Sequence, residues 1–360
     1  MNPITVIRER ISKLGLDGVL LNTSEITRSF NLKYLSGFSG SDATILITRT
    51  ELKLFTDGRY KLQCKEECAD FQVHVTRDKI KSISNFLRRK NTKRLGLEGN
   101  RISFDLVSAL KRSSKEIEFV SFDKRNLECL RIKKDKIEIE KIASAAKIAS
   151  SSCNDLLEMG LSGMTEIEIA GRLEFLFKKN GASGESFQTI VASGIRSALP
   201  HGMPTDKIVQ SGELLIVDFG CVFLDYCSDE TVTLVIGTPN LQQEKIHQVV
   251  YDAHYRAIDS LKAGVSCVYV DAVARKTISD AGYGKYFMHS LGHGVGLEVH
   301  EAPYLSPRRK TILEEGMVFT IEPGIYIEGF GGVRLESLVH LTASGPEILS
   351  KAPKSLISIN

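Results

Sequence analysis

The 360-residue sequence contains no tryptophan and no run of 18 apolar residues, so it predicts no membrane-spanning helix. The sequence also lacks an excess of charge of either sign, because 47 Lys and Arg nearly balance 44 Asp and Glu. The net charge of +3 argues against a protein dedicated to nucleic acid. With 42% hydrophobic and 25% charged residues, the composition is that of a globular chain and excludes a disordered or collagen-like one.

The seven cysteines are odd in number and form no Cys-x-x-Cys pair, which excludes a zinc ribbon, a redox motif and a regular disulfide framework. Cys64 and Cys68 lie four apart on a predicted helix, a spacing more typical of packing than of a ligand pair. The first ten residues carry charges where a secretion signal has its apolar core. We therefore expect a reduced, cytoplasmic protein.

The length predicts two domains, at roughly 100–200 residues each. In the first third of the chain, short β-rich runs alternate with helical periodicity, which predicts a mixed α/β domain. The predicted strands are 18–21, 43–48, 52–56 and 94–98, and the predicted helices are 3–14 and 79–90.

A charged stretch at 131–136 then precedes a long helical pattern, so we predict domains at 1–127 and 128–360. Thr165 and Glu168 form a capping-box pattern that opens a second helix. Further helices are predicted at 241–262 and 266–281. The first 129 residues carry 24 basic and 16 acidic side chains and the remainder 23 and 28, so the second part has the sign that a cation site built from carboxylates would produce.

Two aspartates in the second domain are the first candidates for such a site. Asp218 ends the apolar run 214–217, where a buried carboxylate needs a compensating charge. Asp229 follows eleven residues later, a separation of roughly 36 Å on a straight strand. A hairpin turning near 223–225 would bring the two face to face.

Three histidines fall within twelve residues, at His289, His293 and His300. Three glycines among them prevent a regular helix and let the backbone approach a site closely. Neutral imidazole suits Zn, Mn, Co or Fe equally. The alternative is a glycine-rich turn with solvated histidines.

Glu322 ends the apolar run 317–321, and Arg334 and Glu336 lie two apart, which predicts one face of a strand. Each of these residues alone could be an ordinary charged residue on an edge strand. Together, four carboxylates and one histidine could hold two divalent ions roughly 3.5–4 Å apart.

This order of residues resembles the M24 metallopeptidase family, the pita-bread group of aminopeptidase P, prolidase, methionine aminopeptidase and creatinase. The resemblance rests on Gly-His-Gly-Val-Gly-Leu-Glu-Val-His-Glu at 292–301, Glu-Pro-Gly at 322–324 and Arg-Leu-Glu at 334–336, and it covers essentially the whole chain. It implies an α+β fold, with an N-terminal creatinase-like α/β accessory domain before a C-terminal pita-bread catalytic domain. A methionine aminopeptidase would lack the first 125 or so residues.

The resemblance also implies roles for individual residues. A hydroxide bridging two divalent ions would attack the carbonyl before proline, with Mn²⁺ as the expected metal and Co²⁺, Zn²⁺ or Fe²⁺ as alternatives. The implied metal ligands are Asp218, Asp229, His293, Glu322 and Glu336. The implied catalytic residues are His201, His300 and Glu322, and the implied substrate-binding residues are His289 and Arg334.

The stretches 34–41 and 55–60 are similar to those of aminopeptidase P and its short Xaa-Pro relatives. Prolidases commonly have an arginine four residues after the histidine that matches His300, and here that position is Tyr304. We therefore predict an Xaa-Pro aminopeptidase, with an Xaa-Pro dipeptidase as the alternative because Arg308 or Arg309 could substitute.

A second departure is Val232, which stands where relatives often have arginine, although Thr231 before it could bond a ligand carboxylate. Two competing interpretations are a non-catalytic M24 module and a creatinase-like amidinohydrolase, and the complete set of five ligands disfavours both. The expected partners are peptides with an N-terminal Xaa-Pro sequence and a second copy of the chain in a homodimer. No nucleic acid or membrane is expected as a partner.

Overall fold

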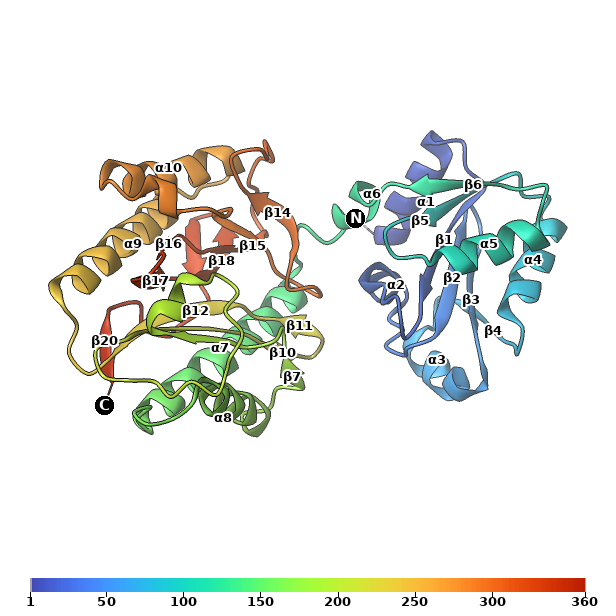
Figure 1. Cartoon of the computed structure of the whole chain (residues 1–360). Helices are drawn as coiled ribbons and strands as arrows, with labels where there is room; N and C mark the ends of the chain where they lie inside the picture. Colours follow the sequence, from blue (N-terminus) through green and yellow to red (C-terminus); the bar gives the residue numbers. More distant parts are fainter. Residues whose placement is uncertain (1, 360) are drawn as a thin grey trace. The chain divides into compact units, whose positions relative to one another are not determined.

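A computed structural model describes residues 2–359 of the chain and divides it into two compact units (Figure 1). The first unit ends at Leu130 and the second begins at Arg131, whereas the sequence placed the division between residues 127 and 128. Among the described residues, no helix is both long and apolar enough to cross a membrane.

The first unit is built on a six-stranded mixed sheet with the order β4-β3-β2-β1-β5-β6. Strands β1, β2 and β3 are antiparallel neighbours, and the outer pairs are parallel. Its elements are α1 (Pro3–Lys13), β1 (Gly18–Thr23), α2 (Phe30–Ser36), β2 (Ala43–Thr48), β3 (Leu52–Thr56), η1 (Gly58–Tyr60), α3 (Lys61–Glu67), β4 (Gln72–Val75), α4 (Lys79–Arg89), β5 (Arg94–Glu98), α5 (Phe104–Ser113), β6 (Glu118–Phe122) and α6 (Arg125–Glu128).

Both faces of this sheet are buried, which explains why its central strands are continuous apolar runs rather than alternating ones. On β1, Val19 and Leu21 point into one hydrophobic cluster and Leu20 into the other. Helix α1 covers the first face with Ile7 and Ile11, one helical turn apart, while α4 covers the second. The predicted strands and helices of this domain are confirmed, with bounds shifted by up to two residues.

The second unit begins with two helices, continues through several short sheets, and has a second helix pair between them. Its elements are α7 (Lys136–Glu158), α8 (Glu166–Lys179), β7 (Gly184–Glu185), β8 (Ile190–Ser193), η2 (Gly194–Ala198), β9 (Leu214–Phe219), β10 (Cys221–Phe223), β11 (Tyr226–Cys227), β12 (Glu230–Ile236), α9 (Leu241–Asp259), α10 (Cys267–Asp280), η3 (Gly284–Tyr286), β13 (Gly292–Gly294), β14 (Glu301–Leu305), β15 (Val318–Ile321), β16 (Gly324–Ile327), β17 (Gly331–Arg334), β18 (Ser337–Thr342), β19 (Gly345–Ile348) and β20 (Ile357–Ile359).

Two sheets in this unit lie between two helix pairs (Figure 1). Helices α7 and α8 pack through one hydrophobic cluster on the sheet β20-β12-β9-β8. Helices α9 and α10 pack through another on the sheet β14-β13-β15-β18-β19. Helix α8 begins with the predicted capping box, in which Thr165 and Glu168 each bond the other's backbone N–H.

The predicted hairpin between the two aspartates is present. Strands β10 and β11 are joined by Leu224 and Asp225, which have φ values of 46° and 74°, as a two-residue hairpin turn requires. Asp218 and Asp229 are brought together as expected, with carboxylate oxygens within 4.8 Å of each other. They are not direct strand partners, however, because the residue paired with Asp218 is Thr231. The short β10–β11 ribbon pairs with β7 instead of extending β9 and β12, so Asp229 lies just before β12 begins.

Candidate active site

A pocket of about 590 Å³ opens in the second unit, within the range of roughly 300–1,000 Å³ that is typical of small-ligand sites. All five predicted metal ligands and the three predicted pocket histidines line it. The lining residues are Phe187, Gln188, Ile190, Pro200, His201, Met203, Asp218, Asp229, His289, Ser290, Gly292, His293, His300, Tyr304, Glu322, Tyr326, Arg334 and Glu336.

The candidate metal ligands come from both sheets and from the connections between strands. Asp218 lies on β9 and His293 on β13, whereas the other three lie beside strand ends. They form overlapping groups whose ligand atoms all lie within 4.8 Å of one another. The groups are Asp218, Asp229 and Glu336; His293, Glu322 and Glu336; and Asp229, His293 and His300.

The electrostatics of this cluster fit divalent cations. Burial, and then the neighbouring carboxylates, raise the pKa of Asp229 and of Glu336 well above their ordinary values. Burial also raises the pKa of Glu322 to about 8. The Oδ1 atom of Asp218 is buried and has no hydrogen-bond partner among residues 2–359. Buried, mutually repelling carboxylates beside an imidazole match the oxygen and nitrogen donors that first-row divalent metals take.

Each of three carboxylates is held by a hydrogen bond to one of its two oxygens. Thr231 Oγ1 donates to Glu336 Oε2 over 2.6 Å, which confirms the predicted bond from Thr231 to a candidate ligand. Thr320 Oγ1 donates to Glu322 Oε1 over 3.2 Å. Arg334 Nη2 donates to the Oδ2 atom of Asp218 over 2.6 Å. These bonds fix the orientation of each carboxylate and leave it with lone pairs that an ion could take.

His293 is placed as a ligand by its neighbours. Its Nδ1–H donates to the carbonyl of Gly294 over 3.1 Å, which leaves the Nε2 lone pair 3.5 Å from Asp229 Oδ2 and 3.4 Å from Glu322 Oε1. Burial, and then His300, lower the pKa of His293 to about 3, so the ring is neutral. A Cβ on Gly292 would lie 2.0 Å from the carbonyl of Thr320, which confirms the close approach predicted for these glycines.

Arg334 is almost fully buried, and most of its guanidinium N–H groups already donate hydrogen bonds to protein oxygens. Besides Asp218, its guanidinium donates to Tyr326, to the Pro200 carbonyl and to Thr231. Arginine has five N–H groups, so one remains, and the substrate contact predicted for Arg334 stays a prediction.

The expectation that Arg334 and Glu336 share one strand face is wrong. Strand β17 ends at Arg334, and Glu336 lies in the connection to β18. The cause is a hydrogen bond from the Glu336 backbone N–H to the Thr231 carbonyl, which draws this residue toward β12.

Three histidines that the sequence singled out surround the candidate metal ligands. His289 is held at both ring nitrogens, because Nδ1–H donates to the Ser290 carbonyl over 2.8 Å and Nε2 accepts from the Tyr326 hydroxyl over 3.0 Å. Burial lowers the pKa of His289 to about 4. The His300 ring packs edge-on against His293, with 4.2 Å between centroids. His201 reaches the pocket from the segment that follows η2.

Sequence reasoning did not find Tyr326, which joins His289 to Arg334 through its hydroxyl. Burial raises the pKa of Tyr326 to about 12. The only sequence signal is its place on the strand that follows Glu322, and a tyrosine in a strand is ordinary.

We expect the thermal unfolding midpoint of the metal-free protein to fall between pH 7.5 and 9. Glu322 holds its proton to a pKa of about 8 when folded but to about 4.5 when unfolded. This stabilisation is complete below pH 4.5 and is lost as the pH rises through 8. Buried histidines such as His289, whose pKa falls from 6.5 to about 4 on folding, oppose the trend near pH 6.5, but above pH 7.5 they are almost entirely neutral in both states. Calorimetry in chelator checks this, and a flat or rising midpoint would contradict it.

The pita-bread fold and its acidic, histidine-lined pocket define the class as a metal-dependent peptidase. A model of metallopeptidase family M24 matches residues 140–343, and a model of the creatinase/prolidase N-terminal domain matches residues 4–132. The chain belongs to metallopeptidase family M24. The predicted α+β fold, with a creatinase-like domain before a pita-bread domain, is thereby confirmed.

Individual relatives cover both domains. An Xaa-Pro dipeptidase from Pyrococcus furiosus is 40% identical over 98% of this chain and 100% of its own length. The solved structure of an Xaa-Pro dipeptidase from Bacillus anthracis has a TM-score of 0.94 with 37% identity and covers 99% of each chain. That of an X-Pro aminopeptidase from Thermotoga maritima has a TM-score of 0.89 with 41% identity, covering 97% of this chain and 99% of its own.

Proposed function

We propose that this protein hydrolyses Xaa-Pro bonds and prefers Xaa-Pro dipeptides. The observation that carries the proposal is whole-chain similarity to proteins named Xaa-Pro dipeptidase, at 40% identity for the relative from Pyrococcus furiosus. The sequence-based preference for an aminopeptidase is not confirmed, and the dipeptidase reading fits these relatives better. That preference rested on the stretches 34–41 and 55–60 and on Tyr304 in place of an arginine.

We further propose that the cluster holds two divalent ions, with Mn²⁺ as the proposed metal. The proposed ligands are Asp218, Asp229, His293, Glu322 and Glu336. When bound, such ions lower the pKa of water and polarise the scissile carbonyl.

Protons in this scheme move through Glu322. Thr320 fixes the orientation of its carboxylate through Oε1, and the carboxylate would take a proton from the attacking water and deliver it to the leaving prolyl nitrogen. His300 is suited to donate to the oxyanion, because burial lowers its pKa and keeps it neutral with an N–H available.

The rest of the pocket suits a proline ring. An Xaa-Pro amide has no N–H, so its recognition depends on shape and on the groups around the carbonyl. Phe187, Ile190 and Met203 supply apolar lining. Both ring nitrogens of His289 are already hydrogen-bonded, so we propose that its ring packs against the substrate in a fixed orientation and does not transfer protons.

Arg309 is the cation that we propose for binding the carboxylate of a dipeptide. Tyr304 lines the pocket, and the Arg309 guanidinium carbon lies 5.8 Å from the centroid of its ring. Arg309 is exposed and could reach a carboxylate from this position. The second candidate, an Xaa-Pro aminopeptidase, is favoured by the uncharged Tyr304 itself and by the 41% identity to the Thermotoga maritima protein.

Comparing Ala-Pro with Ala-Pro-Ala on metal-replete protein separates the two candidates. We expect kcat/KM to be about tenfold or more higher for the dipeptide, because a free carboxylate next to proline gains an ionic contact. The amidated dipeptide Ala-Pro-NH₂ is the control, since it keeps the size of the dipeptide and loses the charge. Equal or faster cleavage of the tripeptide would establish the aminopeptidase instead.

A further inference from the structure

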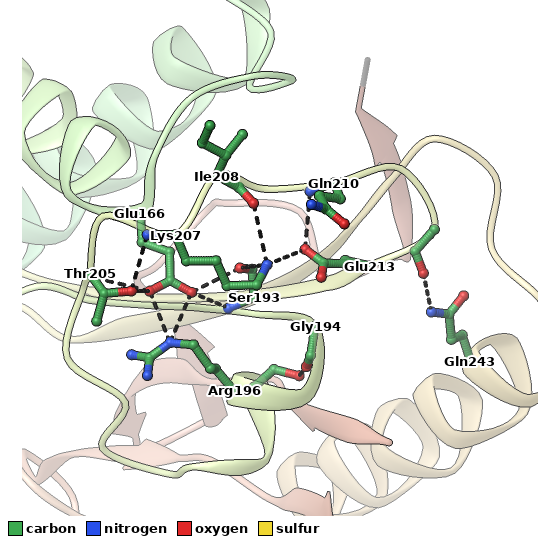
Figure 2. A network of polar contacts seen from close by, with 12 residues as sticks. Glu166, Ser193, Gly194, Arg196, Thr205, Lys207, Ile208, Gln210, Glu213 and Gln243 are labelled. Atoms are coloured by element: carbon green, nitrogen blue, oxygen red, sulfur yellow. Dashed lines mark hydrogen bonds and ion pairs between the residues drawn. The ribbon is translucent and has the colours of Figure 1, made fainter. Parts of the chain in front are cut away.

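A buried carboxylate outside the pocket is hydrogen-bonded to both ends of the segment that carries His201. Glu166, in the first turn of α8, is fully buried. Its Oε1 accepts from the backbone N–H and the hydroxyl of Ser193, each over 2.8 Å. Its Oε2 accepts from the backbone N–H of Thr205 over 3.0 Å and from its hydroxyl over 2.7 Å. One carboxylate thus holds both ends of the segment 194–204 (Figure 2).

Arg196 braces the same segment from within. Its Nε donates to the Glu166 oxygens over 3.3 and 3.1 Å, and its Nη2 donates to the Met203 carbonyl over 2.6 Å. Figure 2 shows the guanidinium directly against the carboxylate. The arginine therefore links the base of the segment to the stretch next to His201.

The middle of the segment is tied to strand β17. The Ser197 hydroxyl accepts from the Gly332 N–H over 2.8 Å, and Arg334 donates to the Pro200 carbonyl over 3.1 Å. Within the described residues 2–359, the ring of His201 itself makes no hydrogen bond. Its position therefore depends on the backbone that these contacts hold.

Glu166 is suited to act as a permanent charge. Burial would raise its pKa, but hydrogen bonds from Thr205 and Ser193 outweigh burial and lower it below the ordinary value. The N-terminus of α8 also favours an anion. Glu166 and Arg196 do not line the pocket, so any effect on the reaction must pass through the segment they hold.

We propose that Glu166 and Arg196 are a positioning pair that sets the place of His201 against the substrate. The inference rests on the proposed function, in which His201 contacts the Xaa-Pro substrate. A brace that only stabilised the fold would have no particular relation to His201, and this difference can be measured.

Arg196→Ala is the first test, because it leaves the Ser193 and Thr205 bonds to Glu166 in place. We expect kcat/KM for Ala-Pro to fall about 10- to 100-fold, as a displaced substrate-contacting group does, with metal content unchanged. The fall should divide between kcat and KM as it does for His201→Ala. Arg196→Lys should recover part of the activity, since lysine can reach Glu166 but cannot bridge to Met203 as well.

The double variant Arg196→Ala/His201→Ala tests whether Arg196 acts on the reaction through His201. In a His201→Ala background, Arg196→Ala should change kcat/KM by less than about twofold, because the group being positioned is gone. Additive losses in the double variant, or an unchanged kcat/KM in Arg196→Ala alone, would overturn the inference. Glu166→Gln provides a second, near-isosteric variant and should behave as Arg196→Ala does.

Glu168→Gln is the matched control, because Glu168 lies on the same helix end, is exposed and hydrogen-bonds to Thr165 at the cap rather than to the segment 194–204. Hydrogen exchange gives a readout that does not need activity. Exchange in 194–204 should become faster in Arg196→Ala and stay unchanged in Glu168→Gln. If the unaltered protein cleaves no Xaa-Pro bond, the proposed function fails while this comparison still decides whether the pair orders the segment. Unchanged exchange in Arg196→Ala would overturn the inference.

Discussion

Replacing Glu336 with alanine is expected to remove both metal binding and peptidase activity. Glu336 belongs to two of the three candidate metal groups, one with Asp218 and Asp229 and one with His293 and Glu322. A carboxylate that belongs to two groups would help to hold both ions, so its loss should affect both positions. We expect kcat to fall about 10³-fold or more, the scale of losing several kcal/mol of transition-state stabilisation.

The control for this prediction is Glu347→Ala, which removes an exposed glutamate on β19. Metal per chain is measured by mass spectrometry after dialysis, together with kcat on Ala-Pro. A Glu336→Ala protein that keeps the metal content and the activity of the unaltered protein would contradict the ligand assignment.

Misfolding is excluded as the cause through the near-isosteric Glu336→Gln variant. In the metal-free protein, burial and the nearby Glu322 and Asp218 raise the pKa of Glu336, so its ionised form is destabilising. At pH 8, metal-free Glu336→Gln should therefore unfold at the same temperature as the metal-free unaltered protein or higher. Added metal should stabilise the unaltered protein by mass action and leave the variant almost unchanged.

Local sequence patterns predicted the part of the site that sits at the ends of apolar runs. Asp218 and Glu322 each end a buried strand or follow one directly, and a carboxylate there is conspicuous without any tertiary information. The glycines around His293 likewise indicate, from the sequence alone, a place where the backbone lies close to other groups. The capping box at Thr165 is equally local, which is why the start of α8 was predictable.

Pairing between distant segments was the part that the sequence could not predict. Asp218 and Asp229 do come together, but the strand partner of Asp218 is Thr231, a register that the sequence does not reveal. Glu336 was expected on the strand of Arg334 but is drawn out by a bond to a residue more than a hundred positions away. Such contacts leave no periodicity in the chain.

Single residues within polar networks were missed for a related reason. Tyr326, Glu166 and Arg196 carry no motif, and their importance comes only from what they touch. The choice between aminopeptidase and dipeptidase shows the same limit. The identity of Tyr304 could be read directly, whereas the cation over its ring comes from Arg309, five residues further along.

We also expect peptidase activity to be lost when the metal is removed and to return when it is restored. The candidate ligands concentrate four carboxylates around one histidine, and burial keeps Asp229 and Glu336 from ionising readily on their own. Stripped protein should therefore be folded and inactive, because the proposed reaction depends on bound ions to lower the pKa of water. Restoring Mn²⁺ should bring back activity, with Co²⁺, Zn²⁺ and Fe²⁺ compared in parallel.

Metal-dependent Xaa-Pro hydrolysis is tested most directly by proline release from Ala-Pro by stripped protein, before and after divalent metal is restored. We predict no release without metal, release on restoration, and uptake of about two ions per chain. Circular dichroism of the same samples shows that the protein stays folded throughout. Undiminished release from fully stripped protein, or no release with any of the four metals in a folded protein, would contradict this prediction.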